Sequence, residues 1–293
     1  MSLFMPKNVI VQGITGTHGQ FHTKTMCEFG TNIIAGTSPN KAGTMVENVP
    51  VYQSIIEIKK DISIIDASVI FVPAPHAKGA IMEAIDAGIP LIVCITEGIP
   101  VHDMLIVKER LKSSKSVLLG PNCPGFITPG HVKIGIIPAS VTLPGSVAVV
   151  SRSGTLTYET ASSLTKYNIG QRAIVGIGGD PIKGLDFIEC LKEFEADESV
   201  DTIILIGEIG GSSEIAAAEY IQQYITKPVF AYIAGHNAPL GVQLGHAGAI
   251  LKSDADTAAA KSTSLQRAGA QTFNSVTELV LAVKEFKSGD VQS

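Results

Sequence analysis

Short apolar runs alternate with helix-length segments along most of the chain, and this alternation restricts its fold more than any other feature. In the first part, the predicted strands cover residues 8–12, 33–36, 68–72, 90–95 and 117–119, and the predicted helices cover 18–29, 77–87 and 102–112. A strand that returns parallel to its neighbour needs a crossover, usually a helix, so repeated strand–helix units predict a parallel sheet with helices on both faces.

The alternation restarts after a segment rich in Pro and Gly. The predicted strands there are 146–150, 172–177, 202–206 and 229–234, and the predicted helices are 155–167, 185–195, 214–224, 256–268 and 276–286. We therefore expect an α/β protein with a doubly wound domain over residues 1–122, a crossover linker over 123–145 and a second doubly wound domain over 146–293.

Length and composition agree with two domains and exclude some partners. The chain has 293 residues, of which 45% are apolar, so each half can bury a core. The formal net charge is −5, Trp is absent and aromatic residues make up 5%, which argues against nucleic acid as a partner. We also expect no membrane span, because no apolar stretch is long enough.

The cysteines and the start of the chain suggest a reducing compartment. Cys27, Cys94, Cys123 and Cys190 form no CxxC pair, so we expect free thiols and no metal site. Residues 1–6 lack a charged region followed by a long apolar run, so we expect no secretory signal. A cytoplasmic or mitochondrial-matrix location follows, and we prefer the cytoplasm.

A glycine-rich loop follows the first predicted strand. Gly13, Gly16 and Gly19 stand between that strand and the next helix, in the spacing GxxGxxG rather than the common GxGxxG. Glycines permit a tight turn there, and the helix N-terminus presents free N–H groups to an anion. The arrangement predicts a phosphate-binding loop, although a plain tight turn would have the same composition.

The loop after the second strand narrows the choice of ligand. An NAD site usually has an acidic residue there, to bind a ribose hydroxyl. This chain has Thr37, Ser38 and Lys41 instead. Hydroxyls and a lysine suit a ribose that carries a phosphate, as in NADP or coenzyme A (CoA), while the alternative for Lys41 is a solvated loop residue.

Candidate catalytic residues occur in the second half. His246 stands among small residues in the stretch 245–250, where an imidazole could act as a nucleophile if a partner held its other ring nitrogen. Glu208, in a stretch flanked by glycines, could be that partner. The alternatives are a histidine in an ordinary turn and a solvated loop acid.

Several stretches together resemble the alpha subunits of succinyl-CoA synthetases (succinate–CoA ligases). They run in family order along nearly the whole chain: residues 13–19, 72–75, 95–100, 120–125, 151–159, 176–181, 207–211 and 245–250. The resemblance implies a Rossmann-like CoA-binding domain followed by a flavodoxin-like ligase domain that carries a phosphohistidine.

The resemblance also implies a reaction and the residues that perform it. Succinate, CoA and ATP or GTP would give succinyl-CoA, a nucleoside diphosphate and phosphate, through an acyl phosphate and phosphorylated His246, with Glu208 orienting that histidine. The implied CoA contacts are Thr15, Gly16, Thr17, His18, Lys41, Ile95, Thr96 and Glu97; Tyr158 would contact the acid, and Ser153, Gly154 and Thr155 the phosphate. No ATP-binding domain is recognisable, so the family's beta subunit would supply the nucleotide and Mg²⁺ site in an alpha–beta or alpha2–beta2 assembly.

Three departures from the family pattern keep alternatives open. Residues 251–256 lack the expected glycine- and lysine-rich loop, residues 239–243 lack expected basic residues, and His18 replaces a glutamine. The first two leave a related acid–CoA ligase, for example one that uses malate, as an alternative, whereas His18 concerns only a detail of CoA contact. An NADP-dependent oxidoreductase would explain the glycine loop but not His246, and a CoA-sensing module would need neither Glu208 nor His246.

Overall fold

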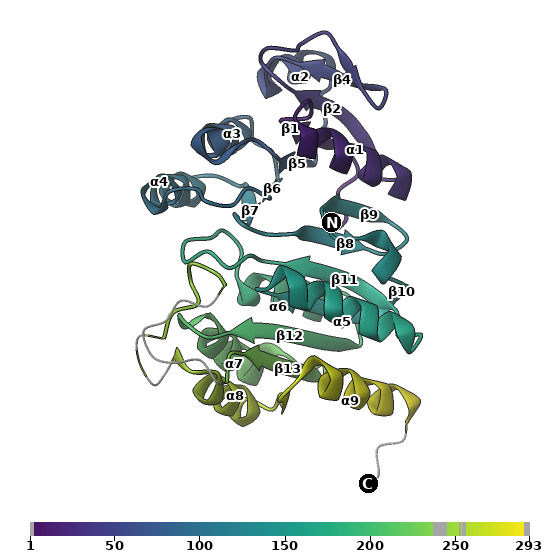
Figure 1. Ribbon diagram of the computed structural model, residues 1–293, viewed down its shortest axis with the longest axis vertical. Helices are drawn as coiled ribbons and strands as arrows, with labels where there is room; N and C mark the ends of the chain where they lie inside the picture. Colours follow the sequence, from purple (N-terminus) through teal and green to yellow (C-terminus); the bar gives the residue numbers. More distant parts are fainter. Residues whose placement is uncertain (1–2, 237–244, 252, 254–255, 290–293) are drawn as a thin grey trace. The chain divides into compact units, whose positions relative to one another are not determined.

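The computed structural model describes residues 3–236, 245–251, 253 and 256–289, and the chain forms two compact units (Figure 1). The first unit contains Met1–Ile127, His131–Ile137 and Ile182–Leu185; the second contains Thr128–Gly130, Pro138–Pro181 and Asp186–Ser293.

The first unit is built on a largely parallel sheet. Its strands are β1 (Val9–Gln12), β2 (Ile33–Thr37), β3 (Met45–Val46), β4 (Val49–Tyr52), β5 (Ala67–Ile70), β6 (Leu91–Cys94) and β7 (Val117–Leu119), in the order β3-β4-β2-β1-β5-β6-β7. Only β3 pairs antiparallel, with β4. From β4 to β7 this is the strand order of the Rossmann fold, as the resemblance implied.

Helices cover both faces of this sheet. They are α1 (Thr17–Phe29), α2 (Ile55–Asp61), α3 (Ala74–Asp86) and α4 (Val101–Lys112). One hydrophobic cluster joins Ile58 of α2, Ile81 of α3 and Met104 of α4 to buried residues of the strands, so these three helices share a face. Burial of each such side chain contributes about 1.5–3 kcal/mol, so this cluster stabilises the packing of the three helices on the sheet.

The second unit has the other doubly wound order. Its parallel strands are β10 (Pro144–Ser151), β11 (Gln171–Gly176), β12 (Thr202–Glu208), β13 (Val229–Ala234) and β14 (Gln271–Phe273), in the order β14-β13-β12-β10-β11. This is the flavodoxin-like order 2-1-3-4-5, as expected.

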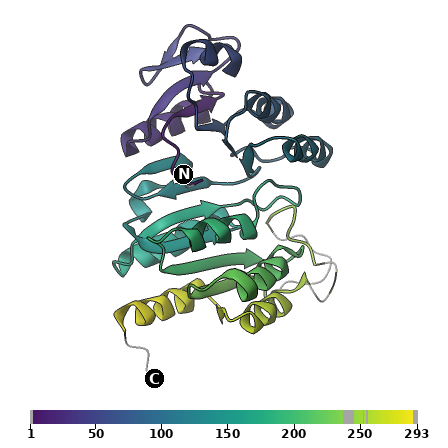
Figure 2. The same cartoon turned by 180° about the vertical axis from the view of Figure 1, so that it is seen from behind.

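The helices of the second unit are α5 (Gly154–Lys166), α6 (Phe187–Ala196), α7 (Ser213–Tyr224), α8 (Ala258–Arg267) and α9 (Val276–Ser288). Helices α5 and α9 pack together on one face, and α6, α7 and α8 form a row on the other (Figures 1 and 2). Covered on both sides, the segment 203–206 of β12 is fully buried, which is why it has the continuous apolar composition of a central parallel strand.

Several elements differ from the sequence expectations. The segment 123–145, expected as a crossover linker, contains β8 (Gly125–Thr128), β9 (Val132–Gly135) and the 3-10 turn η1 (Ala139–Val141). Phe126 and Ile134 are fully buried in those short strands, whose apolar residues are too closely interrupted by Pro and Gly to form a recognisable pattern. The elements β3, β4, α2 and β14 were not predicted either.

The start of α6 shows a signal that the sequence analysis overlooked. We expected this helix from residue 185, whereas it begins at Phe187. Asp186 and Glu189 form a capping box: the backbone N–H of Glu189 donates to the Asp186 side chain, and Asp186 N donates to Glu189 Oε2 at 3.0 Å. Such reciprocal bonds satisfy free N–H groups of the first turn and fix where the helix starts.

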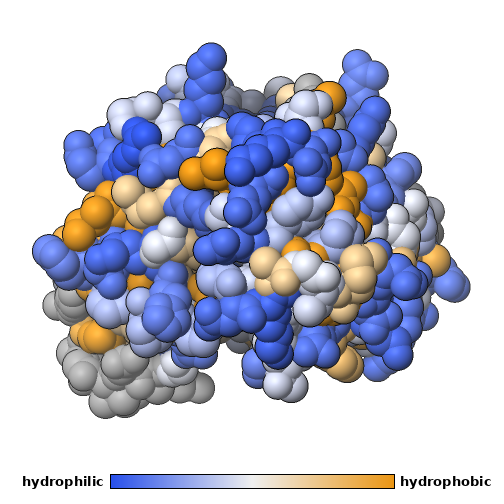
Figure 3. Space-filling view, turned by 90° about the horizontal axis from the view of Figure 1, so that it is seen from above, coloured by the Kyte–Doolittle hydropathy of each residue, from blue (hydrophilic) through white to orange (hydrophobic). Residues whose placement is uncertain are grey.

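Within the described residues, no helix combines the length and the apolar character that crossing a membrane requires. The face drawn in Figure 3 is mostly hydrophilic, with hydrophobic residues in small separate groups. Exposed apolar side chains such as Phe21, Ile56 and Tyr224 come from different helices, and single apolar residues of this kind are normal on a protein surface.

The glycine loop between β1 and α1 depends on close backbone packing. Gly13 has a φ of +82°, which favours glycine. Gly19 lies in the first turns of α1, where an added Cβ would stand 2.1 Å from the carbonyl oxygen of Gly13. A side chain at residue 19 would therefore push the helix away from the loop.

We expect Gly19→Ala to destabilise the first unit by about 1–3 kcal/mol, the usual cost of overpacking. The matched control is Gly79→Ala in α3, where an added Cβ meets no atom within 4 Å, so this change should stabilise the helix by about 0.5–1 kcal/mol. Urea unfolding of both variants and the parent measures the difference, and equal midpoints would contradict the packing argument.

Candidate functional site

The first unit has a cavity of about 850 Å³ where β1 and β5 end. These neighbouring strands mark the point at which the strand order reverses, where doubly wound sheets bind their ligands. The lining comes from the ends of β1 and β2, from the loops after β1, β2, β4 and β5, and from α1 and α3: Gln12, Gly13, Thr15, Gly16, Thr17, His18, Thr37, Ser38, Pro39, Asn40, Gln53, Phe71, Val72, Pro73, His76, Ala80 and Glu83.

The cavity wall includes the N-terminus of α1. The N-cap residue, Gly16, makes no side-chain capping bond, and the first turn has no acidic residue. The first N–H groups of this helix are therefore available to a ligand, and the positive end of the helix dipole favours an anion. Beside it, Thr15 Oγ1 donates to Ser38 Oγ at 2.8 Å, which joins the loops after β1 and β2.

The implied CoA contacts fall into two groups. Thr15, Gly16, Thr17 and His18 line the cavity. Among the described residues, Lys41, Ile95, Thr96 and Glu97 stand outside this lining. Two of these residues are tied to loops of the cavity: Lys41 N donates to Ser38 O at 3.1 Å, and Thr96 Oγ1 donates to Val72 O at 2.7 Å.

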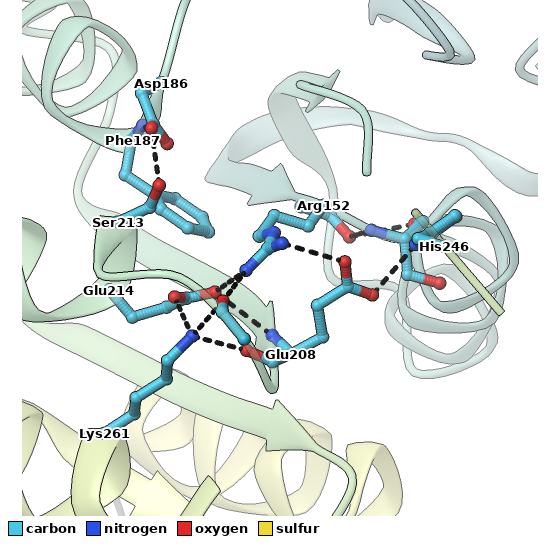
Figure 4. A network of polar contacts seen from close by, with 11 residues as sticks. Arg152, Asp186, Phe187, Glu208, Ser213, Glu214, His246 and Lys261 are labelled. Atoms are coloured by element: carbon cyan, nitrogen blue, oxygen red, sulfur yellow. Dashed lines mark hydrogen bonds and ion pairs between the residues drawn. The ribbon is translucent and has the colours of Figure 1, made fainter. Parts of the chain in front are cut away.

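The second unit brings His246 and Glu208 together (Figure 4). Nδ1 of His246 lies 2.9 Å from Oε2 of Glu208, across 38 residues of sequence. Glu208 is the last residue of β12 and is 7% exposed, so the alternative of a solvated loop acid is wrong. The carboxylate is held at a strand end, close to β10, where the strand order of this unit also reverses.

Gly179, Gly210 and Gly248 let the segment around His246 pack closely against neighbouring loops. An added Cβ at Gly179 would stand 2.2 Å from Cγ of His246, and one at Gly210 would stand 2.2 Å from the carbonyl oxygen of Gly248. Gly248 N donates to Gly179 O at 3.1 Å, which ties the segment to the loop after β11. Small residues around His246 are therefore a packing requirement of this site.

The contact with Glu208 fixes the chemical state of the imidazole. A carboxylate can only accept a hydrogen bond, so the neutral ring donates from Nδ1 and leaves the lone pair of Nε2 free. The hydrogen bond to Glu208 raises the pKa of His246 above the ordinary histidine value, against the lowering effects of burial and of Arg152, with smaller help from Asp180. The site thus favours a ring protonated at Nδ1.

The turn after β10 has the residues expected to contact phosphate. Ser153 is the N-cap of α5 and its Oγ accepts from Leu156 N at 3.3 Å, while Gly154 begins the helix. An added Cβ at Gly154 would meet no atom within 4 Å, and Thr155 is exposed. Tyr158, expected at the acid substrate, lies one turn further and is partly buried.

Sequence reasoning gave no role to Arg152, Gly179, Glu214 or Lys261, all of which surround the His246–Glu208 contact. Arg152 and Gly179 stand in stretches that carry the family resemblance, whereas nothing in the helical sequence around Lys261 distinguishes it. The departures at residues 239–243, 252, 254 and 255 lie outside the described residues. Across the described ranges, no three His, Cys, Asp or Glu side chains gather as metal ligands would.

Comparison with known proteins supports both halves of the chain. Residues 4–98 match the profile of the CoA binding domain, and residues 150–271 match that of the CoA-ligase domain. A succinate–CoA ligase (ADP-forming) alpha subunit of Archaeoglobus fulgidus is 52% identical over 277 residues, which are 94% of this chain and 96% of the relative. The alpha subunit of Aquifex aeolicus is 52% identical over 264 residues, which are 89% of this chain and 86% of the relative.

A solved structure has the same fold over the whole chain. ATP citrate lyase from Methanothrix soehngenii, in complex with citrate and coenzyme A, superposes with a TM-score of 0.86 at 26% identity. The match covers 100% of this chain and 52% of the lyase, so the chain spans about half the length of that protein. Together with the two relatives at 52% identity, the comparison shows that the chain belongs to the family of succinate–CoA ligase alpha subunits.

Proposed function

We propose that this chain, with a beta subunit, joins succinate to CoA at the expense of ATP and releases ADP and phosphate. The observation that carries the proposal is the 2.9 Å contact between Nδ1 of His246 and Glu208, at the strand end where such folds bind ligands. The names of the relatives, succinate–CoA ligases that form ADP, support the acid and the nucleotide.

His246 is proposed as the phosphoryl carrier. With Nδ1–H donated to Glu208, Nε2 has a free lone pair that can attack phosphorus. Phosphorylation places positive charge on the ring, and the adjacent carboxylate stabilises it. A phosphorus–nitrogen bond of this kind is labile, unlike a serine phosphate, so the group can pass on to succinate or back to ADP.

The later steps of the proposed reaction form the acyl phosphate and then the thioester. Succinate would accept the phosphoryl group and become succinyl phosphate, whose carbonyl the CoA thiol would then attack, with release of phosphate. The cavity in the first unit is proposed to bind CoA, because its wall combines a free helix N-terminus with the hydroxyls of Thr15 and Ser38. Ser153, Gly154 and Thr155 are proposed to hold phosphate, Tyr158 to contact succinate, and the beta subunit to bind ATP and Mg²⁺.

We expect the isolated chain to bind CoA and not NADP in a calorimetric titration. If Lys41 contacts the 3′-phosphate, Lys41→Gln should weaken CoA binding about tenfold, the loss typical of a hydrogen bond to a charged group. Dephospho-CoA should bind the variant and the parent equally. Lys24→Gln, in an exposed pair with Glu28, is the matched control. Equal weakening of both ligands by Lys41→Gln, or NADP binding without CoA binding, would contradict the assignment.

Incubation with the beta subunit, Mg²⁺ and labelled ATP should place an acid-labile, alkali-stable label on His246. His246→Asn should remove the label and all turnover but keep CoA binding, because the CoA cavity is lined by residues of the first unit. Without the beta subunit the parent chain should acquire no label. A label that persists in His246→Asn, or that resists acid, would refute the role of this histidine.

Glu208→Gln should slow phosphorylation of His246 by about ten- to a hundredfold, as is usual when the partner of a functional histidine is changed. Because the carboxylate raises the pKa of His246, its loss should also move the acid limb of the pH–rate profile to lower pH, where the ring now stays neutral. Glu198→Gln removes an exposed carboxylate of the same unit and serves as control. A profile unchanged in Glu208→Gln would show that the contact does not govern the histidine.

A further inference from the structure

The carboxylate that meets His246 belongs to a buried cluster of charged side chains. Its members are Arg152, Glu208, Glu214 and Lys261 (Figure 4). The side chains of Glu214 and Lys261 are fully buried, and that of Arg152 is 3% exposed. Two cations and two carboxylates are thus kept away from water, an arrangement that is stable only with close pairing.

Arg152 is the link between the two carboxylates. It follows β10 directly, and its Nη1 donates to Glu214 Oε1 at 3.0 Å and to the carbonyl oxygen of Gly210 at 2.9 Å. Its Nη2 lies 3.2 Å from Oε1 of Glu208. Because a guanidinium is planar and rigid, the two contacts of Nη1 fix the direction in which Nη2 meets Glu208.

Lys261 of α8 holds Glu214 and the backbone around Glu208 in place. Its Nζ donates to Glu214 Oε2 at 2.5 Å and to the carbonyl oxygens of Glu208 and Gly210, both at 2.8 Å. The lysine thereby holds the backbone at the end of β12 and the carboxylate that orients Arg152. Oε1 of Glu208 faces Arg152, and Oε2 is left to face Nδ1 of His246.

A role in stability alone does not explain this cluster. Apolar side chains of similar volume fill such a space without the desolvation that buried charges suffer. The ion pair of Arg172 and Asp197, at the start of β11 in the same unit, shows the ordinary case: it has a short contact of 2.8 Å but is partly exposed and touches neither Glu208 nor His246.

We propose that Arg152 is a positioning residue for His246, which holds the Glu208 carboxylate so that its Oε2 meets Nδ1 and the lone pair of Nε2 stays free. The inference rests on the proposed role of His246 as phosphoryl carrier. Glu214 serves Arg152 in turn, since it holds the guanidinium from the buried side, and Lys261 holds the carboxylate of Glu214.

The charge of Arg152 has a second effect that can be measured separately. Among the described residues, three charged groups act on the ring, each from the end of a different strand: Glu208 at the end of β12, Arg152 after β10 and Asp180 after β11. Glu208 raises the pKa of His246 most, burial and Arg152 lower it, and Asp180 raises it slightly. Arg152 therefore limits protonation of the nucleophile, in opposition to the carboxylate that it positions.

Two substitutions separate geometry from charge. Arg152→Gln removes the charge and the fork, whereas Arg152→Lys keeps the charge but cannot reach Glu208, Glu214 and Gly210 in one plane. Arg172→Gln is the matched control, because it breaks an ion pair of this unit away from His246. The measurements on the full chain are the pKa and tautomer of His246 by ¹⁵N NMR of the ring, and the phosphorylation rate with the beta subunit, Mg²⁺ and ATP.

We expect Arg152→Gln to lose the uniform Nδ1–H tautomer of His246 and to slow phosphorylation by about ten- to a hundredfold. Arg152→Lys should lose the uniform Nδ1–H tautomer and a similar part of the rate. Its His246 pKa should fall, because the charge at residue 152 stays while the Glu208 contact, which raises the pKa most, is lost. The pKa in Arg152→Gln should lie above that in Arg152→Lys, since Arg152→Gln also loses the charge that lowers it. Arg172→Gln should match the parent in every measurement. All the variants should bind CoA as tightly as the parent does.

A parent-like tautomer and rate in Arg152→Lys would overturn the proposal. If Arg152→Gln does not fold, Arg152→Lys alone is the deciding variant. A drop in rate with an unchanged tautomer in Arg152→Lys, or an equal drop in Arg172→Gln, would show a general structural effect and would also overturn it. Absence of label on His246 in the parent would refute the proposed function instead, while the tautomer and pKa of the unphosphorylated chain would still test Arg152.

Discussion

A parallel strand that is buried on both faces can present a polar side chain to a ligand only where the strand ends. This constraint explains where both candidate sites lie. In β12 the segment 203–206 is fully buried, and the carboxylate of Glu208 appears at the end of the strand. In the first unit, β1 is buried throughout and is followed directly by the glycine loop of the cavity. Both candidate sites therefore stand at reversals of strand order, where neighbouring loops diverge.

Close approach of backbone is the second condition that both units share. Gly19 lets α1 start against the carbonyl of Gly13, and Gly179 lets the imidazole of His246 lie against the loop after β11. In the first case the glycine brings a helix N-terminus to the cavity, and in the second it brings a ring to a carboxylate. The same lack of a side chain thus serves an electrostatic purpose in one unit and a geometric purpose in the other.

Much of the fold could be predicted from the sequence, because continuous apolar runs and glycine-rich turns are local signals. The short strands within 123–145 could not, since their apolar pairs are interrupted by Pro and Gly and become strands only through burial. In the candidate site, His246 and Glu208 were both expected, but Glu208 ends a strand and is buried, a result of pairing between β12 and its neighbours. Arg152, Glu214 and Lys261 meet only in three dimensions, and no spacing in the sequence indicates that they do.

Lys261 has a further chemical consequence for a protein that handles activated acyl groups. Acyl phosphates and thioesters acylate free amines, and burial lowers the pKa of Lys261 although Glu214 opposes this, which would by itself increase the fraction of reactive amine. An ammonium group has three protons, and Lys261 donates them to Glu208 O, Gly210 O and Glu214 Oε2 in a pocket that solvent does not reach. The lone pair that acylation needs is therefore engaged in these hydrogen bonds, so this buried amine beside Glu208 is protected from the acyl intermediates of the proposed reaction.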